Sequence, residues 1–370
     1  MNVAHEQNGQ SGIPVGQAKE LATRAIQKIA ETWQVDKARS QWSERQFNWW
    51  PGDFRVCVRA QIPSDQDYLT CDDSHQPAHA CRLITITDLL KDFSPDGKRL
   101  AQCALFARNL TSTYAWVHPP GLDNEGFWLS SSAYIDGENI GWMPEFFAKT
   151  SIIQAINAQI HAPRVAELLG SGVPDHSRPA ALRDAGLDEM LEVIAQVYVP
   201  LGQQQSRWTG TDEFEKFAEE WGRSDLCFGN GDTTGLTLET PFGNDTALVR
   251  LHTEGKHPQL GYGLLGTLQV PYFAELEMIA RECADLNALE SGSWTGFPQL
   301  GCWHWQESRG TQGGLAFTSF IPNALYQPGI ATNLAIWLVA RSRWLRQIKW
   351  PDAVDQPSSP LSRRGTARSK

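Results

Sequence analysis

Apolar and polar positions in the second half of the chain follow two periods, one typical of helices and one typical of strands. Helical spacing predicts a helix at Thr209–Gly222, and period-two alternation predicts strands in "TGLTLETPF", "GNDTALVRLHTE" and "LGYGLLGTLQV". Pro271 is expected to open a second helix, because proline is tolerated in a first helical turn. Two strand-like runs, "QLGCWHWQE" and "GGLAFTSFIP", and a helix at Gly329–Trp350 complete the order.

The first half shows the same order with weaker signals. The expected elements are a helix at Gln17–Trp33 with a further turn to Trp42, strands at Asp53–Ile62, "DYLTCDD" and Cys81–Thr87, a helix at Gly97–Ser112, paired strands in "TYAWVHPPG" and "GFWLSSSAYI", and a closing helix at Trp142–Ile160. "CALFARNL" is similar to "RECADLNAL", and "GFWLSSSAYI" is similar to "GGLAFTSFIP". The pattern predicts an α+β fold made of two copies of one α-β-β-β-α-β-β-α unit with antiparallel sheets.

These copies define the expected domains. We expect a first unit over residues 15–165, a Gly- and Pro-rich linker over 166–190, a second unit over 191–350, and a disordered basic tail over 351–370. Packed together as one pseudo-symmetric body, the two units would make the chain monomeric, because each copy supplies the other at high effective concentration.

The segment GYGLLG, Gly261–Gly266, matches the G-x-G-x-x-G fingerprint of dinucleotide-binding proteins. A pyrophosphate site requires a helix directly after the last glycine, and here the extended residues "TLQV" follow. The chain also lacks the βαβ alternation of a nucleotide-binding sheet. We therefore expect a strand, and no cofactor.

Composition excludes several classes of partner. The chain of 370 residues has a net charge of −10, so a nucleic-acid partner is not expected. We expect neither a signal peptide nor a membrane span, because no charged start precedes an apolar run and "LAIWLVA" is too short to cross a bilayer. Seven irregularly spaced cysteines favour reduced thiols and a cytoplasmic location.

Several of these residues resemble the bacterial YbjN family, which has the fold of class I type III secretion chaperones. The resemblance rests on Leu286, Asn287, Trp294, Gly314, Leu315, Phe317 and Pro322, with first-copy counterparts at Asn109, Gly126, Phe127 and Leu129. It covers Thr209–Trp350, and more loosely Gln17–Ile160. It implies an acidic α+β protein without catalytic residues, and for the secretion chaperones a homodimer that holds segments of a partner.

The sequence "CDDSHQPAHAC" is the strongest candidate for metal binding. Cys71, His75, His79 and Cys81 are residue types that bind zinc, and the second copy has His252 and His257 in the corresponding connection. The alternative is a polar hairpin loop, because structural zinc sites usually show tighter cysteine spacing. We expect no metal.

Alternation in "GCWHWQ" places Cys302 and His304 on one face of a strand, as a nucleophile pair would require. No orienting acid can be assigned, and no other catalytic motif is present. We therefore expect a protein without enzymatic activity.

The 15 tryptophans indicate a protein partner, because aromatic residues are enriched at interfaces and in cores. Contacts are expected from Trp49, Trp50, Trp303, Trp305, Trp344, Arg343 and Arg346, with Arg341 in the same basic strip of the last helix. The predicted function is a non-catalytic protein-binding module: a chaperone, an adaptor or a regulatory subunit of a larger complex. The alternative is a metal- or small-ligand-binding regulator, or an enzyme, that uses the Cys71–Cys81 loop.

Overall fold

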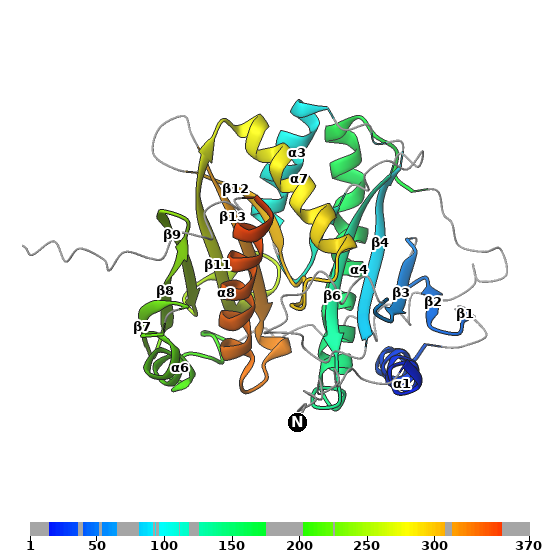
Figure 1. Cartoon of the computed structure of the whole chain (residues 1–370). Helices are drawn as coiled ribbons and strands as arrows, with labels where there is room; N and C mark the ends of the chain where they lie inside the picture. The colour runs from blue at the N-terminus through cyan, green and yellow to red at the C-terminus, as the bar shows by residue number, and fades with distance from the viewer. Residues whose placement is uncertain are drawn as a thin grey trace, which may run out of the picture.

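The structure is a computed structural model, and it describes residues 15–35, 40–51, 54–64, 81–91, 93, 96–110, 112–117, 126–174, 203–224, 226–307 and 313–349. Within these ranges the chain is an α+β protein with six α-helices and two antiparallel sheets, neither of which closes into a barrel. The predicted fold class is confirmed to this extent. The first sheet is blue to green in Figure 1, and the second is green to orange.

The first sheet has the strand order β1-β2-β3-β4-β6-β5. Alternation in β3 buries Val56, Val58 and Ala60 toward the helices and turns the residues between them to the other face. The side chain of Gln154 in the covering helix accepts a hydrogen bond from Ser131 of the sheet. The elements are α1 (Val15–Thr32), β1 (Gln41–Ser43), β2 (Gln46–Trp49), β3 (Val56–Gln61), β4 (Cys81–Lys91), β5 (Ala115–Val117), β6 (Gly126–Ile135) and α4 (Met143–Leu169).

The second sheet has the order β7-β8-β9-β11-β13-β12, with β10 paired to β11. Its apolar face packs on α8, and a Cβ on Gly266 would lie only 2.7 Å from a methyl group of Leu334. The elements are α6 (Glu213–Trp221), β7 (Phe228–Asp232), β8 (Gly235–Phe242), β9 (Asp245–His252), β10 (Lys256–His257), β11 (Gly261–Ala274), β12 (Cys302–Glu307), β13 (Gly313–Pro322), the short η3 (Asn323–Leu325) and α8 (Ile330–Lys349).

GYGLLG lies at the start of β11, so the prediction of a strand is confirmed. The expectation that Pro271 opens a helix is wrong, because β11 continues to Ala274 and α7 spans Leu276–Gly292. The pairing of β11 with β13 shifts register between Gln269 and Phe273. A proline lacks a backbone N–H and is tolerated at such an irregularity.

The predicted helical turn reaching Trp42 is also wrong. Gln41–Ser43 pairs with Gln46–Trp49 as a hairpin, and the rings of Trp42 and Phe47 stack with centroids 4.8 Å apart. Cross-strand aromatic contacts of this kind stabilise a hairpin. The strand expected in "DYLTCDD", the linker beyond Pro174 and the tail over 351–370 lie outside the described residues.

The two sheets share one topology. Leaving β10 aside, the strands of each sheet, counted in chain order, lie in the spatial order first, second, third, fourth, sixth, fifth. The expected tandem repeat is compatible with this order, and it stays a prediction. No helix in the described part of the chain is long and apolar enough to span a membrane.

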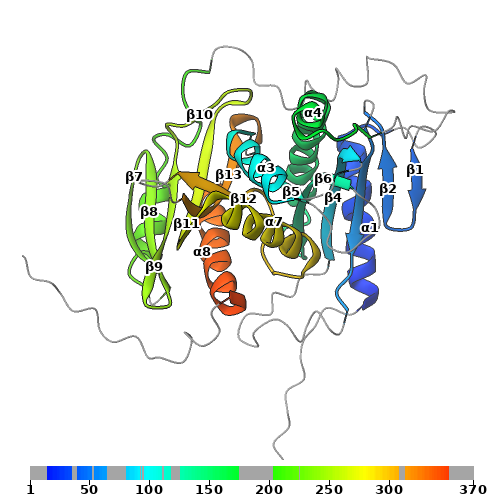
Figure 2. The ribbon, with the colours of Figure 1, turned by 90° about the horizontal axis from the view of Figure 1, so that it is seen from above.

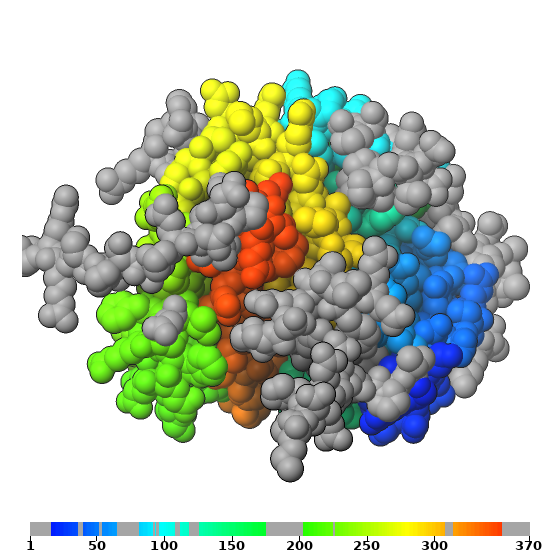
Figure 3. Space-filling view, in the orientation of Figure 1, coloured from blue at the N-terminus to red at the C-terminus, as the bar shows by residue number. Residues whose placement is uncertain are grey.

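Helices α3 (Gly97–Leu110) and α7 lie side by side between the two sheets. Figure 2 shows both helices in the middle of the molecule, and in Figure 3 the cyan atoms of α3 lie against the yellow atoms of α7. Leu100, Ala104 and Ala280 form a buried cluster at this contact. The small alanine side chains allow the two helices to approach closely, and the contact joins the two halves of the chain.

Backbone hydrogen bonds also cross between the halves. The amide of Ser132 in β6 donates to Gln299 at 3.1 Å, and the amide of Phe320 in β13 donates to Ser112 at 3.1 Å. Each bond continues the edge of one sheet with a residue from the other half. The side chains at this joint are therefore held by both halves.

Candidate functional site

Three of the tryptophans expected at a partner interface lie in the interior. Trp49 and Trp50 are each 4 % exposed and Trp303 is fully buried. The ring of Trp49 stacks on Trp33 with centroids 4.8 Å apart, and Trp303 contacts Phe317 edge-on. A partner that leaves this fold intact does not reach these side chains.

The other candidates, Trp305, Trp344, Arg343 and Arg346, are half-buried. Trp344 packs edge-on against Phe297 with centroids 5.9 Å apart, so much of its ring contributes to the fold. These four stay predicted contact residues.

Arg341 does not belong to a surface strip, and this expectation is wrong. The residue is 1 % exposed and forms an ion pair with the fully buried Glu290 of α7. Its Nε lies 3.1 Å from each carboxylate oxygen, and its guanidinium stacks on Phe317 at 3.7 Å from the ring centroid. Cations near a helix end are usually solvated, so sequence alone favoured the surface.

Glu290 connects elements from both halves. One of its carboxylate oxygens accepts a hydrogen bond from Trp303 Nε1 at 3.0 Å, and its backbone oxygen accepts one from Arg82 of β4 at 2.7 Å. The same Arg82 nitrogen donates to Ser132 at 3.0 Å. A buried charge is tolerated when it is paired and hydrogen bonded in this way. This network holds the fold together, and no motif in the sequence indicated it.

Cys302 and His304 each have other hydrogen-bond partners in the structure. His304 Nε2 lies 2.6 Å from the Thr318 hydroxyl and Nδ1 lies 2.9 Å from the Trp305 carbonyl, while the Cys302 thiol lies against Asn287 and the Trp303 carbonyl. Burial raises the pKa of Cys302 to about 12. A thiol with such a pKa has almost no thiolate at neutral pH and is a poor nucleophile.

The candidate metal loop falls largely outside the described residues, which include neither Cys71, His75 nor His79. Cys81 is described: it is buried at the start of β4, and burial raises the pKa of its thiol to about 12. Among the described residues, no group of three or more His, Cys, Asp or Glu side chains could hold a metal ion.

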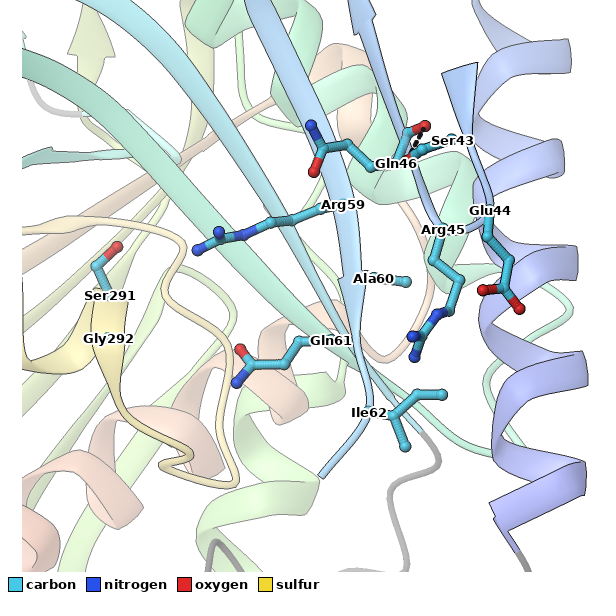
Figure 4. Close-up of a pocket in the computed structure, with 10 residues that line it drawn as sticks. All are labelled: Ser43, Glu44, Arg45, Gln46, Arg59, Ala60, Gln61, Ile62, Ser291 and Gly292. Carbon is cyan, nitrogen blue, oxygen red and sulfur yellow. Dashed lines mark hydrogen bonds between the residues drawn. The ribbon is translucent and has the colours of Figure 1, made fainter. Parts of the chain in front are cut away.

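An open groove of about 670 Å³ lies between the first sheet and the end of α7. Arg59 and Gln61 extend from β3, and Gln46 from β2, toward Ser291 and Gly292 (Figure 4). They point this way because Arg59 and Gln61 alternate with the buried Val58 and Ala60.

The groove is rich in hydrogen-bonding groups. The side chains of Gln46, Arg59 and Gln61 form no hydrogen bond or ion pair with any other described residue. Arg59 is exposed, so its guanidinium is solvated and accessible. The alternation of polar residues in "VRAQ" could have indicated this face, but its proximity to residues 291–292 could not be seen in the sequence.

Comparison with protein-family models, with curated proteins and with solved structures gave no match to this chain. The resemblance to the YbjN family therefore stays a prediction.

Proposed function

We propose that this protein is a non-catalytic protein-binding module that acts as a chaperone, adaptor or regulatory subunit. It holds an extended acidic segment of a partner in the groove between the first sheet and the end of α7. The supporting observation is the row of Gln46, Arg59 and Gln61, whose side chains face the groove without a partner among the described residues. An amide side chain both donates and accepts hydrogen bonds, as the peptide groups of an extended segment do. A guanidinium binds a carboxylate in bidentate geometry.

The groove differs from the surface that the tryptophans suggested. Buried aromatic residues such as Trp49 and Trp303 stabilise the fold, so the polar row on β2 and β3 becomes the proposed contact surface. The six described cysteines are all free, which fits the proposed cytoplasmic location. We also propose that the chain is a monomer, because its two halves already pack on each other through α3 and α7.

A peptide-display selection on the immobilised protein tests the proposal. Wild-type protein should enrich acidic sequences, and Arg59→Glu should lose this enrichment because it places a carboxylate where the partner's carboxylate binds. Arg24→Glu is the matched control, since Arg24 is an exposed arginine on α1, away from the groove. Equal enrichment on all three proteins, or none on the wild type, would contradict the proposal.

A further inference from the structure

A pocket of about 410 Å³ is lined by residues from both halves of the chain. The first half contributes the turn after β6 and the start of α4, through Glu138 and Trp142. The second half contributes the loop before β12, through Pro298, and the N-terminal half of α8, through Asn333 and Trp337. No described residue lines both this pocket and the groove between the first sheet and the end of α7. A ligand here is therefore independent of the proposed partner segment.

The turn after β6 is fixed by its own hydrogen bonds. Asp136 Oδ1 accepts from the backbone amides of Glu138 at 2.9 Å and Asn139 at 2.8 Å, and the side chain of Asn139 donates to the Tyr134 carbonyl at 3.0 Å. The amide of Trp142 in turn donates to the backbone oxygen of Asn139 at 3.0 Å. The backbone that carries Glu138 and Trp142 is therefore held in one conformation.

Two indole rings border the pocket. Trp142 and Trp337 are half-buried, and both pack in part against the main core. Trp142 also contacts Phe146, with ring centroids 6.1 Å apart. The core thus supports both rings, and part of each side chain stays accessible at the pocket. The face of an indole attracts cations more strongly than the ring of tyrosine or phenylalanine does.

The polar side chains open to a ligand include hydrogen-bond acceptors. Glu138 is exposed, and its carboxylate forms no hydrogen bond or ion pair with another described residue. Asn333 is half-buried, and its side-chain amide is equally without a partner in the described part of the chain. Asp136 is a second carboxylate of the lining, whereas no lysine, arginine or histidine is among the described lining residues.

The cations bonded to neighbouring backbone are held outside the pocket. Lys28 Nζ donates at 2.6 Å to a backbone oxygen of the turn after β6, and Arg341 donates at 2.7 Å to that of Pro298, but neither cation lines the pocket. Tyr134 does line it, and its ring already has the guanidinium of Arg82 at 5.8 Å from the centroid. The two indoles are therefore the aromatic surfaces left for a ligand.

We propose that this pocket binds an alkylammonium ion, which donates hydrogen bonds to the carboxylate of Glu138 and lies with its carbon chain against the indoles of Trp142 and Trp337. An ammonium group only donates hydrogen bonds, and a carboxylate or the amide oxygen of Asn333 can accept them. The carboxylate and the indole faces both favour a positive ligand over a neutral one of the same shape. The volume of the pocket is within the range of small-molecule sites.

n-Butylammonium is a suitable probe, and n-butanol is its neutral counterpart of the same length. Each is titrated into the full chain and followed by the indole N–H resonances, which Trp142→Phe and Trp337→Phe assign. Butylammonium should bind with a dissociation constant of about 1 mM, as expected for so few atoms, and shift the Trp142 and Trp337 signals. Butanol should bind at least about threefold more weakly at low salt, where the charges are little screened.

Two variants test the contacts. Glu138→Gln keeps the shape of the side chain and removes its charge, so butylammonium binding should weaken about two- to fivefold and butanol binding should stay unchanged. Trp337→Leu removes one indole face and should weaken butylammonium binding about two- to fivefold. Glu239→Gln and Trp221→Leu are the matched controls, because both residues are exposed and neither lines the pocket.

The outcome at Glu138 does not depend on the aromatic variant. Glu138 is exposed, so Glu138→Gln gives a result even if Trp337→Leu fails to fold. No saturable shift of either indole signal, or equal binding of butylammonium and butanol, would overturn the proposal. Equal butylammonium binding by wild type and Glu138→Gln would do the same.

An alkylammonium group can come from a free amine or from a lysine side chain, and a peptide distinguishes the two sources. An acetylated tripeptide with a central lysine is titrated beside butylammonium. Competition between them would assign the site to lysine side chains as well, and a lack of competition would assign it to free amines.

Discussion

Glu290 and His257 are both buried titratable residues of the second half, but their polar atoms are satisfied to different degrees. Both carboxylate oxygens of Glu290 accept hydrogen bonds from Arg341, and one also accepts from Trp303. His257 has hydrogen bonds at Nδ1 and none at Nε2 among the described residues. A buried donor without an acceptor costs about 1–3 kcal/mol.

This difference separates a complete hydrogen-bond network from an incomplete one. The hydrogen bonds of Glu290 leave no position for a ligand, and they join α7, α8, β12 and β4. At His257 the fold leaves one buried donor without an acceptor among the described residues. Replacing Glu290 and replacing His257 are therefore expected to change the free energy of unfolding to different extents.

The largest expected effect is on stability, at Glu290. Glu290→Leu leaves the guanidinium of Arg341 buried without its carboxylate, and breaking a buried pair in this way costs about 3–5 kcal/mol. Urea denaturation followed by tryptophan fluorescence should show this loss of unfolding free energy.

The double variant Glu290→Leu with Arg341→Met is the control for this prediction. With both charges removed, the apolar surroundings of Phe297 and Phe317 should accept the methionine, and most of the stability should return. Costs that simply add in the double variant would show that Glu290 and Arg341 do not act as a pair.

The sequence predicted those parts of the fold that depend on local periodicity. The alternation in "DTALVRLH" corresponds to β9, and the apolar spacing after Gly329 corresponds to α8. The prediction failed where one residue type fits two kinds of structure: proline at position 271 fits a first helical turn as well as an irregular strand. The pairing of Phe273 and Ala274 with Gly314 and Gly313 of β13 shows that the strand continues.

Much less of the candidate sites could be predicted from local sequence patterns. Arg59 and Gln61 alternate visibly in β3, but Ser291 and Gly292, across the groove, are more than 200 positions away in the sequence. Glu290 and Arg341 belong to different helices and pair only because α7 and α8 pack on one side of β13. The free nitrogen of His257 depends on two backbone bonds that no residue type indicates.

Acid should lower the free energy of unfolding through protonation of His257. The unfolded histidine titrates near pH 6.5 and the folded one at about 4, so between these values the unfolded state binds more protons. The free energy of unfolding should therefore fall as the pH is lowered from about 6.5 to about 4, by up to roughly 3 kcal/mol, and be unaffected above that window.

Urea denaturation at several pH values, on wild type and His257→Asn, measures the pH effect. Burial also lowers the pKa values of His161 and His252. His161 also contributes to the low pKa of His257, so the difference between the two proteins reports the titration of His257 together with its interaction with His161. Identical slopes in the two proteins would show that His257 titrates normally and that its ring is not held as a neutral donor.

A smaller loss of unfolding free energy is expected when the acceptor nitrogen Nδ1 of His257 is removed. His257→Leu removes the acceptor of the Gln259 and Leu260 amides and should cost about 1–3 kcal/mol, because both N–H groups lose their partner. His257→Asn keeps an acceptor there and should stay within about 1 kcal/mol of wild type at pH 7.5. If both variants lost equal stability in thermal unfolding, the bonds of Nδ1 would not explain the orientation of the ring.

The smallest effect is expected at a second ion pair between the same two helices. Lys349 of α8 lies 2.8 Å from Glu282 of α7, but the two side chains are 34 % and 21 % exposed. Water already solvates both charges, so Lys349→Met should change the free energy of unfolding by at most about 1 kcal/mol, and less at high salt. Urea denaturation of Lys349→Met and Glu290→Leu under one set of conditions compares an exposed and a buried pair on one helix contact. A loss at Lys349 as large as that at Glu290 would mean that charge between α7 and α8, and not the complete satisfaction of a buried group, determines stability there.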